Sequence, residues 1–342
     1  MNKGAGAFRH PAAHRKRRMI RTRTVTDLEE CRFLWNSLGR RRHVSDLWEF
    51  RICFHRHFQN QPFFLVLEDD HGILGMLPLC RLEKEDMFVF FPGETWQDKT
   101  WLERTPVYCR DREALPELFS VCPPGTYLRY IEADESDLPD ELDLDEIGYV
   151  LHPPELHFNM DEYHKRFSWK KLKAIKKEIS TILAPHCSWH VNRLPDYAAM
   201  VRLNRSRFEH DSYFLDSRFM KGFRDVVLWL HERGWLRMVS LEIGGETAAV
   251  DLGAVFDHSY VVFLGGTHPD FRGIAKAMNM HHIDFALEQR FSRVDFLCGD
   301  FYWKKLWHLD PQPLYKFLSP CLKDQLQPLS FLPSAGLGVS AY

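Results

Sequence analysis

Long apolar runs, paired cysteines and an excess of charge of one sign are all missing from this 342-residue sequence. Because no run of about 18 apolar residues occurs, we expect no transmembrane helix. The eight cysteines stand singly, without a CxxC pair, which favours reduced thiols in a cytoplasmic protein. Lys and Arg total 45 against 47 Asp and Glu. This balance gives no bulk attraction to nucleic acid, which we therefore do not expect as a partner.

The start of the chain is basic but lacks the apolar core of a secretory signal. We expect residues 1–19 to be a disordered basic tail. The alternative is a tether to nucleic acid or to a membrane surface. Peripheral membrane contact thus stays open.

The remaining chain is long enough for two domains and has 45% hydrophobic residues to build their cores. In the first half the pattern predicts helices over Asp27–Leu38 and Leu47–Phe58. A hairpin follows, with strands Phe63–Leu67 and Ile73–Leu79. The acidic stretch Glu132–Glu146 is expected to be a solvated short helix and loop, and the domain boundary is placed near residue 160.

The second half opens with a basic helix, Asp161–Ile182, whose lysines form either a solvated face or a contact for an anionic substrate. CoA phosphates or an acidic glycan would be such substrates. Two further helices lead into three short strands joined by tight turns. A helix, Gly273–Gln289, and a strand, Val294–Cys298, come next. The strands before that helix are predicted at Leu236–Ile243, Ala248–Phe256 and Tyr260–Leu264.

The turn between the third strand and this helix has the composition of an anion site. Gly273 and Ala275 are small enough for a phosphate to approach the backbone, and Arg272 and Lys276 add positive charge. Backbone N–H groups at a helix start and the helix dipole favour a pyrophosphate there. The residues predicted to bind it are Phe271, Arg272, Gly273, Ile274, Ala275 and Lys276.

This turn, following three meander strands, resembles motif A of the GNAT acyltransferases, Gln/Arg-x-x-Gly-x-Gly/Ala. Gly273 and Ala275 match the motif, whereas Asp270 stands where Gln or Arg is usual. In that family the motif holds the pyrophosphate of CoA. The resemblance implies acetyl-CoA, or another acyl-CoA, as co-substrate.

From about Ile20 to Phe317 the chain resembles the double-GNAT acetyltransferases of bacterial cellulose and exopolysaccharide biosynthesis. The most specific match begins at Asp295 and reads Asp-Phe-x-x-Gly, followed by Lys304 and Trp307; Trp303 replaces the family's Tyr. The resemblance implies an α/β (α+β) fold of tandem GNAT-like domains, each a mixed, mostly antiparallel sheet flanked by helices. The implied parts are a degenerate first domain over 20–160, an acyl-CoA-binding domain over 161–320 and a tail over 321–342.

The implied reaction is acyl transfer to a small-molecule or glycan acceptor, such as an amino sugar or a polysaccharide precursor. It needs a base for the nucleophile and an acid for the leaving thiolate. Asp251 is the predicted base, because its neighbours on one strand face, Ala249 and Gly253, leave space for a cleft. Tyr302 is the predicted acid, and Asp300 is a third candidate proton carrier.

Other chemistries receive less support from the residues. Cys298 lacks a convincing His partner for covalent catalysis, and His281-His282 point in different directions on a helix, so no metal is expected. One alternative is a transferase that uses aminoacyl-tRNA, similar to the Fem-type peptidyltransferases, with the basic helix meeting tRNA. Another is a non-catalytic scaffold that retains the fold.

Overall fold

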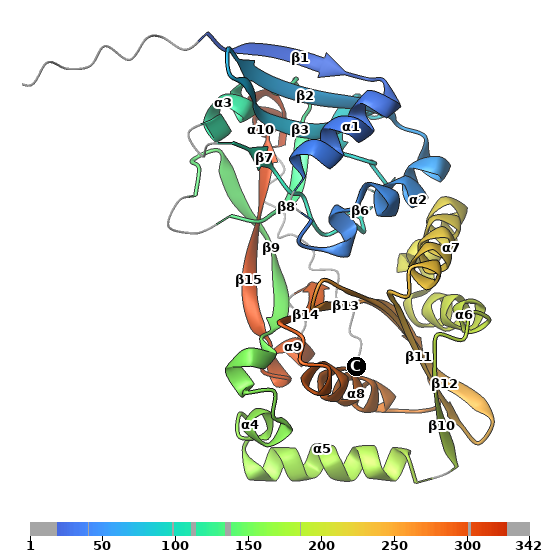
Figure 1. The fold of residues 1–342 in the computed structure, drawn as a ribbon. Coiled ribbons are helices and arrows are strands. Elements are labelled where there is room, and N and C mark those ends of the chain that lie inside the picture. The colour runs from blue at the N-terminus through green and yellow to red at the C-terminus, as the bar shows by residue number, and fades with distance from the viewer. Residues whose placement is uncertain are drawn as a thin grey trace, which may run out of the picture.

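The computed structural model describes residues 19–326, except residues 40, 98, 111–113, 134–137, 185 and 300–301. Within these residues the chain forms two units, one above the other (Figure 1). Of the expected basic tail, residues 1–18 lie outside the described part. The expected C-terminal tail begins with a short helix, α10 (Pro320–Leu326).

The first unit is built on an antiparallel sheet in the order β1-β2-β3-β4, with β7 added to β3. A separate two-stranded ribbon pairs β5 with β6. The bounds are β1 (Arg21–Val25), α1 (Leu28–Leu38), α2 (Trp48–Phe58), β2 (Gln61–Asp69), β3 (Gly72–Leu82), β4 (Met87–Phe90), β5 (Thr95–Trp96), β6 (Lys99–Thr100), β7 (Tyr108–Cys109), α3 (Leu115–Ser120) and β8 (Tyr127–Ile131).

The second unit is built on an eight-stranded sheet in the order β10-β11-β12-β13-β14-β9-β15-β8. Its strands pair antiparallel except β13 and β14, which run parallel. The bounds are β9 (Leu142–Leu151), α4 (Met160–His164), α5 (Trp169–Ile182), β10 (Cys187–Val191), α6 (Asp196–Phe208), α7 (Ser217–Glu232), β11 (Leu236–Ile243), β12 (Glu246–Phe256), β13 (Ser259–Thr267), α8 (Ile274–Glu288), β14 (Arg293–Cys298), α9 (Tyr302–Leu306) and β15 (Asp310–Leu318).

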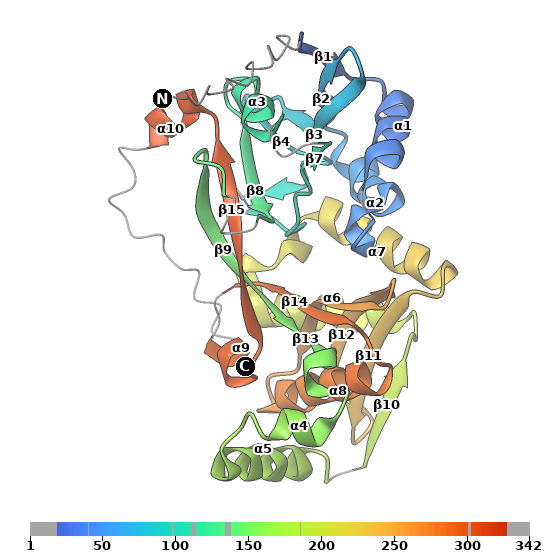
Figure 2. The same cartoon turned by 60° about the vertical axis from the view of Figure 1, so that its left-hand side comes forward.

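The pair β9–β15 connects the two units, because Leu142 and Phe317 pack in the core of the first unit and Leu151 packs in a core of the second. β9, from the first half of the chain, lies between β14 and β15, and β15 pairs on its other edge with β8 (Figure 2). β8 in turn contacts β4 through a parallel bridge, Phe88↔Thr126. The two units therefore follow the same order. In each, antiparallel strands lead to a parallel contact (β4 with β8, β13 with β14), and the strand beyond that contact pairs with β15 or β9. Because the large sheet takes strands from both sides of residue 160, sheet pairing does not locate a domain boundary, and that boundary stays a prediction.

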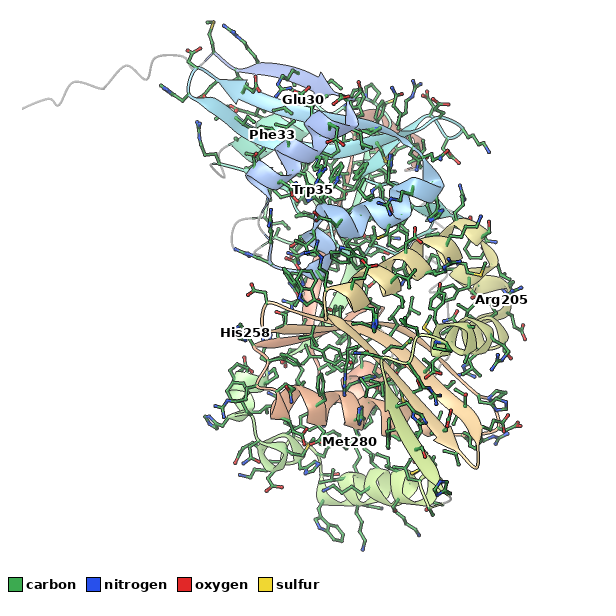
Figure 3. All side chains as sticks on the ribbon, turned by 45° about the vertical axis from the view of Figure 1, so that its right-hand side comes forward. Glu30, Phe33, Trp35, Arg205, His258 and Met280 are labelled. Atoms are coloured by element: carbon green, nitrogen blue, oxygen red, sulfur yellow. The ribbon has the colours of Figure 1, made fainter. Side chains whose placement is uncertain are left out.

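Helices cover both faces of the second unit's meander. α6 and α7 pack on one face through Met200, Phe223 and neighbouring apolar residues. α8 packs on the other through Ile274 and Ala277, and α5 contacts the outer side of α8. In the first unit, Trp35 of α1 is buried, whereas Glu30 and Phe33 of the same helix are exposed (Figure 3).

Most helices and strands predicted from periodicity are confirmed. Asp27 caps α1 by accepting a hydrogen bond from Glu30 N, and the predicted hairpin is β2–β3. The expectation for the acidic stretch 132–146 is partly wrong. Its last residues, from Leu142, form the start of β9, because their backbone pairs with β15 while the acidic side chains alternate along the strand.

Trp101 joins the two units. It comes from the first half of the chain, is buried, and its ring lies 4.4 Å from that of Phe223 and 5.5 Å from that of Phe263 (centroid distances). We expect Trp101→Ala to lower the free energy of unfolding by about 3–5 kcal/mol, because the cavity would open in a core to which both units contribute. Urea denaturation measures this change.

The matched control for that loss is Trp169→Ala on α5, since the Trp169 side chain is 73% exposed. Its cost should stay below about 0.5 kcal/mol, as at other surface positions. Equal losses in the two variants would contradict the joining role of Trp101.

Candidate active site

The candidate site lies where the parallel strands β13 and β14 part. They pair only at Ser259↔Arg293, Tyr260↔Val294 and Val261↔Asp295. β13 then runs on to Thr267 and β14 to Cys298, and no residue pair of this ladder joins those ends. Beyond the ladder, the β14 backbone bonds to side chains instead: Leu297 N–H donates to Asp295, Cys298 N–H donates to Glu103, and Lys304 donates to both carbonyls.

β13 is also irregular at this point. Against β12, Leu264 pairs with Leu252 and Val262 with Gly253, so Phe263 is an extra residue on β13. A bulge of this kind removes one residue from the ladder and re-aims its backbone and side chain. The bulge therefore lies beside the place where the strands separate.

A pocket with a volume of about 40 Å³ opens here, enough for a few water molecules. β13 contributes Val261 and Phe263, and β14 contributes Asp295, Leu297 and Cys298. The first half of the chain closes the pocket from the other side. Its contributions are His43, Val44, Ser45, Trp101, Leu102, Glu103, Arg104, Glu132 and Gly148.

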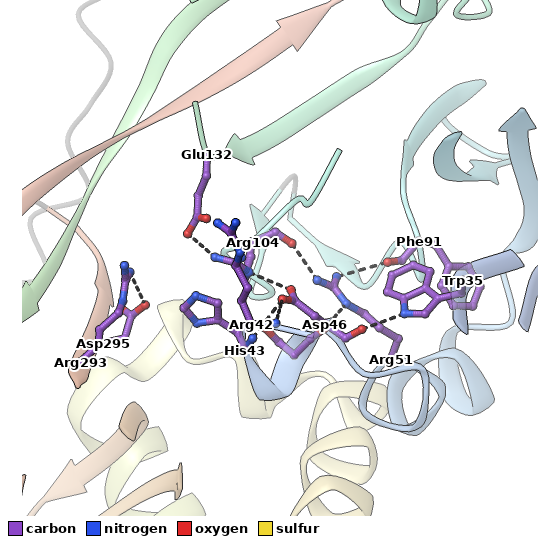
Figure 4. A network of polar contacts seen from close by, with 11 residues as sticks. Trp35, Arg42, His43, Asp46, Arg51, Phe91, Arg104, Glu132, Arg293 and Asp295 are labelled. Carbon is purple, nitrogen blue, oxygen red and sulfur yellow. Dashed lines mark hydrogen bonds and ion pairs between the residues drawn. The ribbon is translucent and has the colours of Figure 1, made fainter. Parts of the chain in front are cut away.

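An ion-pair network holds the wall that comes from the first unit (Figure 4). Arg104 donates from Nε to Asp46 Oδ1 at 2.8 Å and also pairs with Glu132. The carbonyl of Arg104 accepts a 2.7 Å hydrogen bond from the buried Arg51. Burial and the nearby Arg104 charge lower the pKa of His43. Because charged groups bonded on several sides move little, this wall is rigid.

Glu103, which the sequence analysis missed, reaches β14 from the same wall. Its carboxylate accepts a hydrogen bond from the backbone N–H of Cys298. Burial raises the pKa of Glu103, while the charge of Lys304 opposes that rise. Lys304 is 2% exposed and donates to the carbonyl of Leu297 at 2.9 Å. No motif of the sequence indicated Glu103, because its position depends on contact between the two units.

The predicted phosphate loop stands at the start of α8. Gly273 is the N-cap residue in a left-handed conformation (φ +80°), Ile274 and Ala275 are buried, and Arg272 is exposed. Two acids lie nearby. Lys276 pairs with Glu178 of α5 at 2.6 Å, and a Cβ added at Gly273 would lie 2.5 Å from Glu178 Oε1. Asp270 is exposed.

The predicted proton carriers are not brought together in the pocket. Asp251 is 8% exposed, and its Oδ2 lies 2.9 Å from His282 Nε2 of α8. The Tyr260 hydroxyl lies 2.8 Å from the other ring nitrogen of His282. The expectation that this strand face opens on a cleft is therefore not met, because α8 covers it. Tyr302 is 75% exposed on α9, and Asp300 lies outside the described residues.

A second pocket mirrors the first at the contact of β4 and β8. It is lined by Phe90 of β4, by Tyr127 and Tyr130 of β8, and by the buried Glu94, and its volume is about 50 Å³. The helix that leads into β8 is only the short α3, which starts at Leu115 and carries Pro in its first turn. This unit thus repeats the strand arrangement without a glycine-capped long helix.

Two further searches concern the described part of the chain. No group of three or more His, Cys, Asp and Glu side chains among the placed residues is arranged to hold a metal ion. None of the helices in residues 19–326 is both long and apolar enough to cross a membrane.

Comparisons with known proteins show which folds this chain resembles. Residues 180–305 match the model of an acetyltransferase (GNAT) domain, and a search of curated proteins found no match. Among solved structures, the chain is similar to FemX (10% identity, TM-score 0.57, covering 90% of this chain and 99% of that one). It is also similar to L-PGS from Bacillus licheniformis (10%, 0.53, 90% and 97%) and to a conserved protein of unknown function from Bacteroides thetaiotaomicron (12%, 0.50, 86% and 97%).

At such identities these likenesses concern the fold alone. The predicted fold class, tandem GNAT-like units with mixed, mostly antiparallel sheets flanked by helices, is confirmed. The matched region contains β10 to β14, α8 and most of α9, and so includes the parting strands. The finer resemblance to polysaccharide acetyltransferases stays a prediction.

His281, which precedes the Asp251 partner His282 in the chain, gives a prediction about stability and pH. Burial, then the neighbouring His282 and Arg237, lowers the pKa of His281 from 6.5 to about 4. Its ring stacks on Trp189 and accepts a 3.3 Å hydrogen bond from Arg237. Because the folded state disfavours protonation, stability present above pH 6.5 should be lost as the pH falls toward 4. Urea denaturation between pH 7 and pH 4.5 should show that the free energy of unfolding falls less steeply for His281→Gln than for the wild-type protein.

The control is His210→Gln, since the His210 side chain is 85% exposed. That variant should follow the wild-type curve. If His281→Gln followed the wild-type curve as well, the account of a half-buried His281 that stays neutral in the folded state would be refuted.

Proposed function

We propose that the protein is an acyl-CoA-dependent N-acyltransferase of the GNAT type. Its acceptor would be an amino sugar or a polysaccharide precursor. The observation that carries the proposal is the parting of β13 and β14 beside the bulge at Phe263, within the region that matches the GNAT domain. The pocket at this point and the start of α8 at the open end of the strands supply a place for each substrate.

The loop before α8 fits the phosphates of an acyl-CoA. Gly273 caps the helix without a side chain in a conformation that disfavours other residues, so a phosphate could approach the backbone closely. Arg272 and Lys276 would supply positive charge. Because Glu178 is paired with Lys276, the phosphates would have to replace this carboxylate. The pairing costs affinity but also keeps Lys276 oriented.

The two substrates would reach the reacting atoms from opposite faces of the sheet. α8 lies on one face, with Val294 and Phe296 of β14. The pocket opens on the other face, toward the first unit. Bound acyl-CoA would supply the thioester whose acyl group is transferred. The backbone N–H at the Phe263 bulge would stabilise negative charge on the thioester oxygen. The roles of Asp251, Tyr302 and Asp300 in proton transfer stay predictions.

An aminoacyl-tRNA donor is the second candidate. The fold likeness to FemX fits the Fem-type alternative, and α5 carries five lysines and no buried residue. Fold likeness does not choose between the donors. The glycine-capped start of α8 favours acyl-CoA as the donor, because this helix start is suited to bind the pyrophosphate that CoA carries. A scaffold without activity would bind neither donor.

Calorimetric titration with acetyl-CoA tests the proposal. The wild-type protein should give a saturable signal, and Gly273→Glu should abolish it, because the new side chain would fill the phosphate position and repel the phosphates. The matched control is Gly244→Glu in the β11–β12 turn. Gly244 has a φ of +61° and open space around it, so the control has similar backbone strain away from the loop.

The control should bind as the wild-type protein does. Absence of binding by the wild-type protein at millimolar acetyl-CoA would count against the enzyme and favour the scaffold or the tRNA donor. Equal losses of acetyl-CoA binding in both variants would show that backbone strain, and not a lost phosphate contact, explains the effect of Gly273→Glu.

A further inference from the structure

Glu103 is a carboxylate of the first unit that stands in the pocket of the second. It follows Trp101 and Leu102, both of which are buried in the core formed with Phe263 and Phe223. The inference drawn from it rests on the function proposed above and deepens it. It concerns the group that removes a proton from the acceptor.

The segment around Glu103 is held on both sides. Before it, Leu102 N donates a 2.9 Å hydrogen bond to the buried Glu94. After it, Arg104 is paired with Asp46 and Glu132. A carboxylate between two such anchors loses little further freedom when a substrate binds, which is what a catalytic group needs.

The contact with β14 sets the position of the carboxylate. Cys298 donates its backbone N–H to the Glu103 carboxylate. It is three residues beyond Asp295, the last β14 residue that pairs with β13. Glu103 therefore lies where the two strands have already separated. The bulged Phe263 lines the same pocket from the β13 side. An acyl group held between the strands would have the bulge N–H on one side and Glu103 on the other.

The other acids of this pocket are engaged with arginines. Asp295 pairs with Arg293 at 3.1 Å and accepts from Leu297 N at 2.8 Å, and Glu132 pairs with Arg104. Glu103 instead accepts from the backbone N–H and the thiol of Cys298, two uncharged donors, and its two carboxylate oxygens can accept a further hydrogen bond. It is thus the acid best placed to accept a proton from a bound amine.

Several titratable groups face Glu103 from the elements packed around it. The positive charge of Lys304 on α9 favours its ionised form, and burial disfavours it. Hydrogen bonds from Cys298 of β14 also favour the ionised form, whereas the ionisation of Asp295, Tyr130 or Tyr213 would oppose it. A base in this setting takes up its proton at a higher pH than an exposed glutamate does.

We propose that Glu103 is the general base of the transfer reaction. The acceptor nitrogen attacks the thioester carbonyl carbon, a C–N bond forms, and the C–S bond breaks. The Glu103 carboxylate takes the proton that the nitrogen loses and releases it to solvent. The CoA thiolate leaves and is protonated from water, so the products are the amide and CoA. The two units then share one catalytic site.

The test is turnover of acetyl-CoA with glucosamine as the probe acceptor, followed as free thiol. Glu103→Gln keeps an oxygen for Cys298 N–H but cannot take a proton. Its kcat should fall by about 10²–10⁴-fold, the typical contribution of a general base, with little change in the KM for acetyl-CoA. The decline of kcat at low pH, which reports protonation of the base, should disappear. Glu103→Asp should recover part of the rate.

Glu94→Gln is the matched control. Glu94 is likewise a buried glutamate with a raised pKa, and it accepts from Leu102 N. This variant should keep the low-pH decline even if it is less stable. Asp251→Asn and His43→Gln complete the set, since Asp251 is the base predicted from sequence and His43 lines the same pocket.

The outcomes separate the two proposals. If wild-type turnover occurs and Glu103→Gln keeps both its rate and its low-pH decline, Glu103 is not the base. The same holds if Asp251→Asn or His43→Gln alone removes the decline. If the wild-type protein neither transfers nor hydrolyses acetyl-CoA, the proposed function fails, and the assignment of Glu103 fails with it.

Discussion

The pairing of β9 with β15 is the constraint on which both units depend. β9 comes from the first half of the chain and β15 from its end, yet they lie side by side in the eight-stranded sheet, and their residues pack into the cores of both units. Without this pair β14 would lose its antiparallel neighbour, and its parting from β13 would not be held open. The pair also brings the first unit over the pocket, so that Glu103 and Arg104 reach β14. The site is therefore a consequence of topology as much as of local sequence.

The sequence predicts what is local. Asp27 and the apolar spacing behind it indicate α1, and Gly273 after three short strands indicates the start of α8 and the type of fold. Periodicity could not predict the partner of β9, because an acidic strand whose backbone pairs far along the chain looks like a solvated loop. The same limit hid Glu103, whose neighbours Cys298 and Lys304 are about two hundred residues away in the chain.

Asp251 shows where strand geometry is insufficient. Small neighbours on one strand face leave room, but room can be filled by a helix as well as by a substrate. Here α8 supplies His282, which bonds to the carboxylate, and the opposing Gly265 leaves space for it, because a Cβ at Gly265 would lie 1.7 Å from Asp251 Oδ1. Alternation identified the face of Asp251 correctly, but the element covering that face is a tertiary property.

A crystal structure of the protein with CoA tests the central claim most directly. The account predicts the pyrophosphate at the backbone of Gly273 to Lys276, with Glu178 displaced from Lys276. It predicts the thiol between the Phe263 bulge and Cys298, within reach of the Glu103 carboxylate. CoA bound instead at the contact of β4 and β8, or with its thiol outside the parting of β13 and β14, would contradict the account.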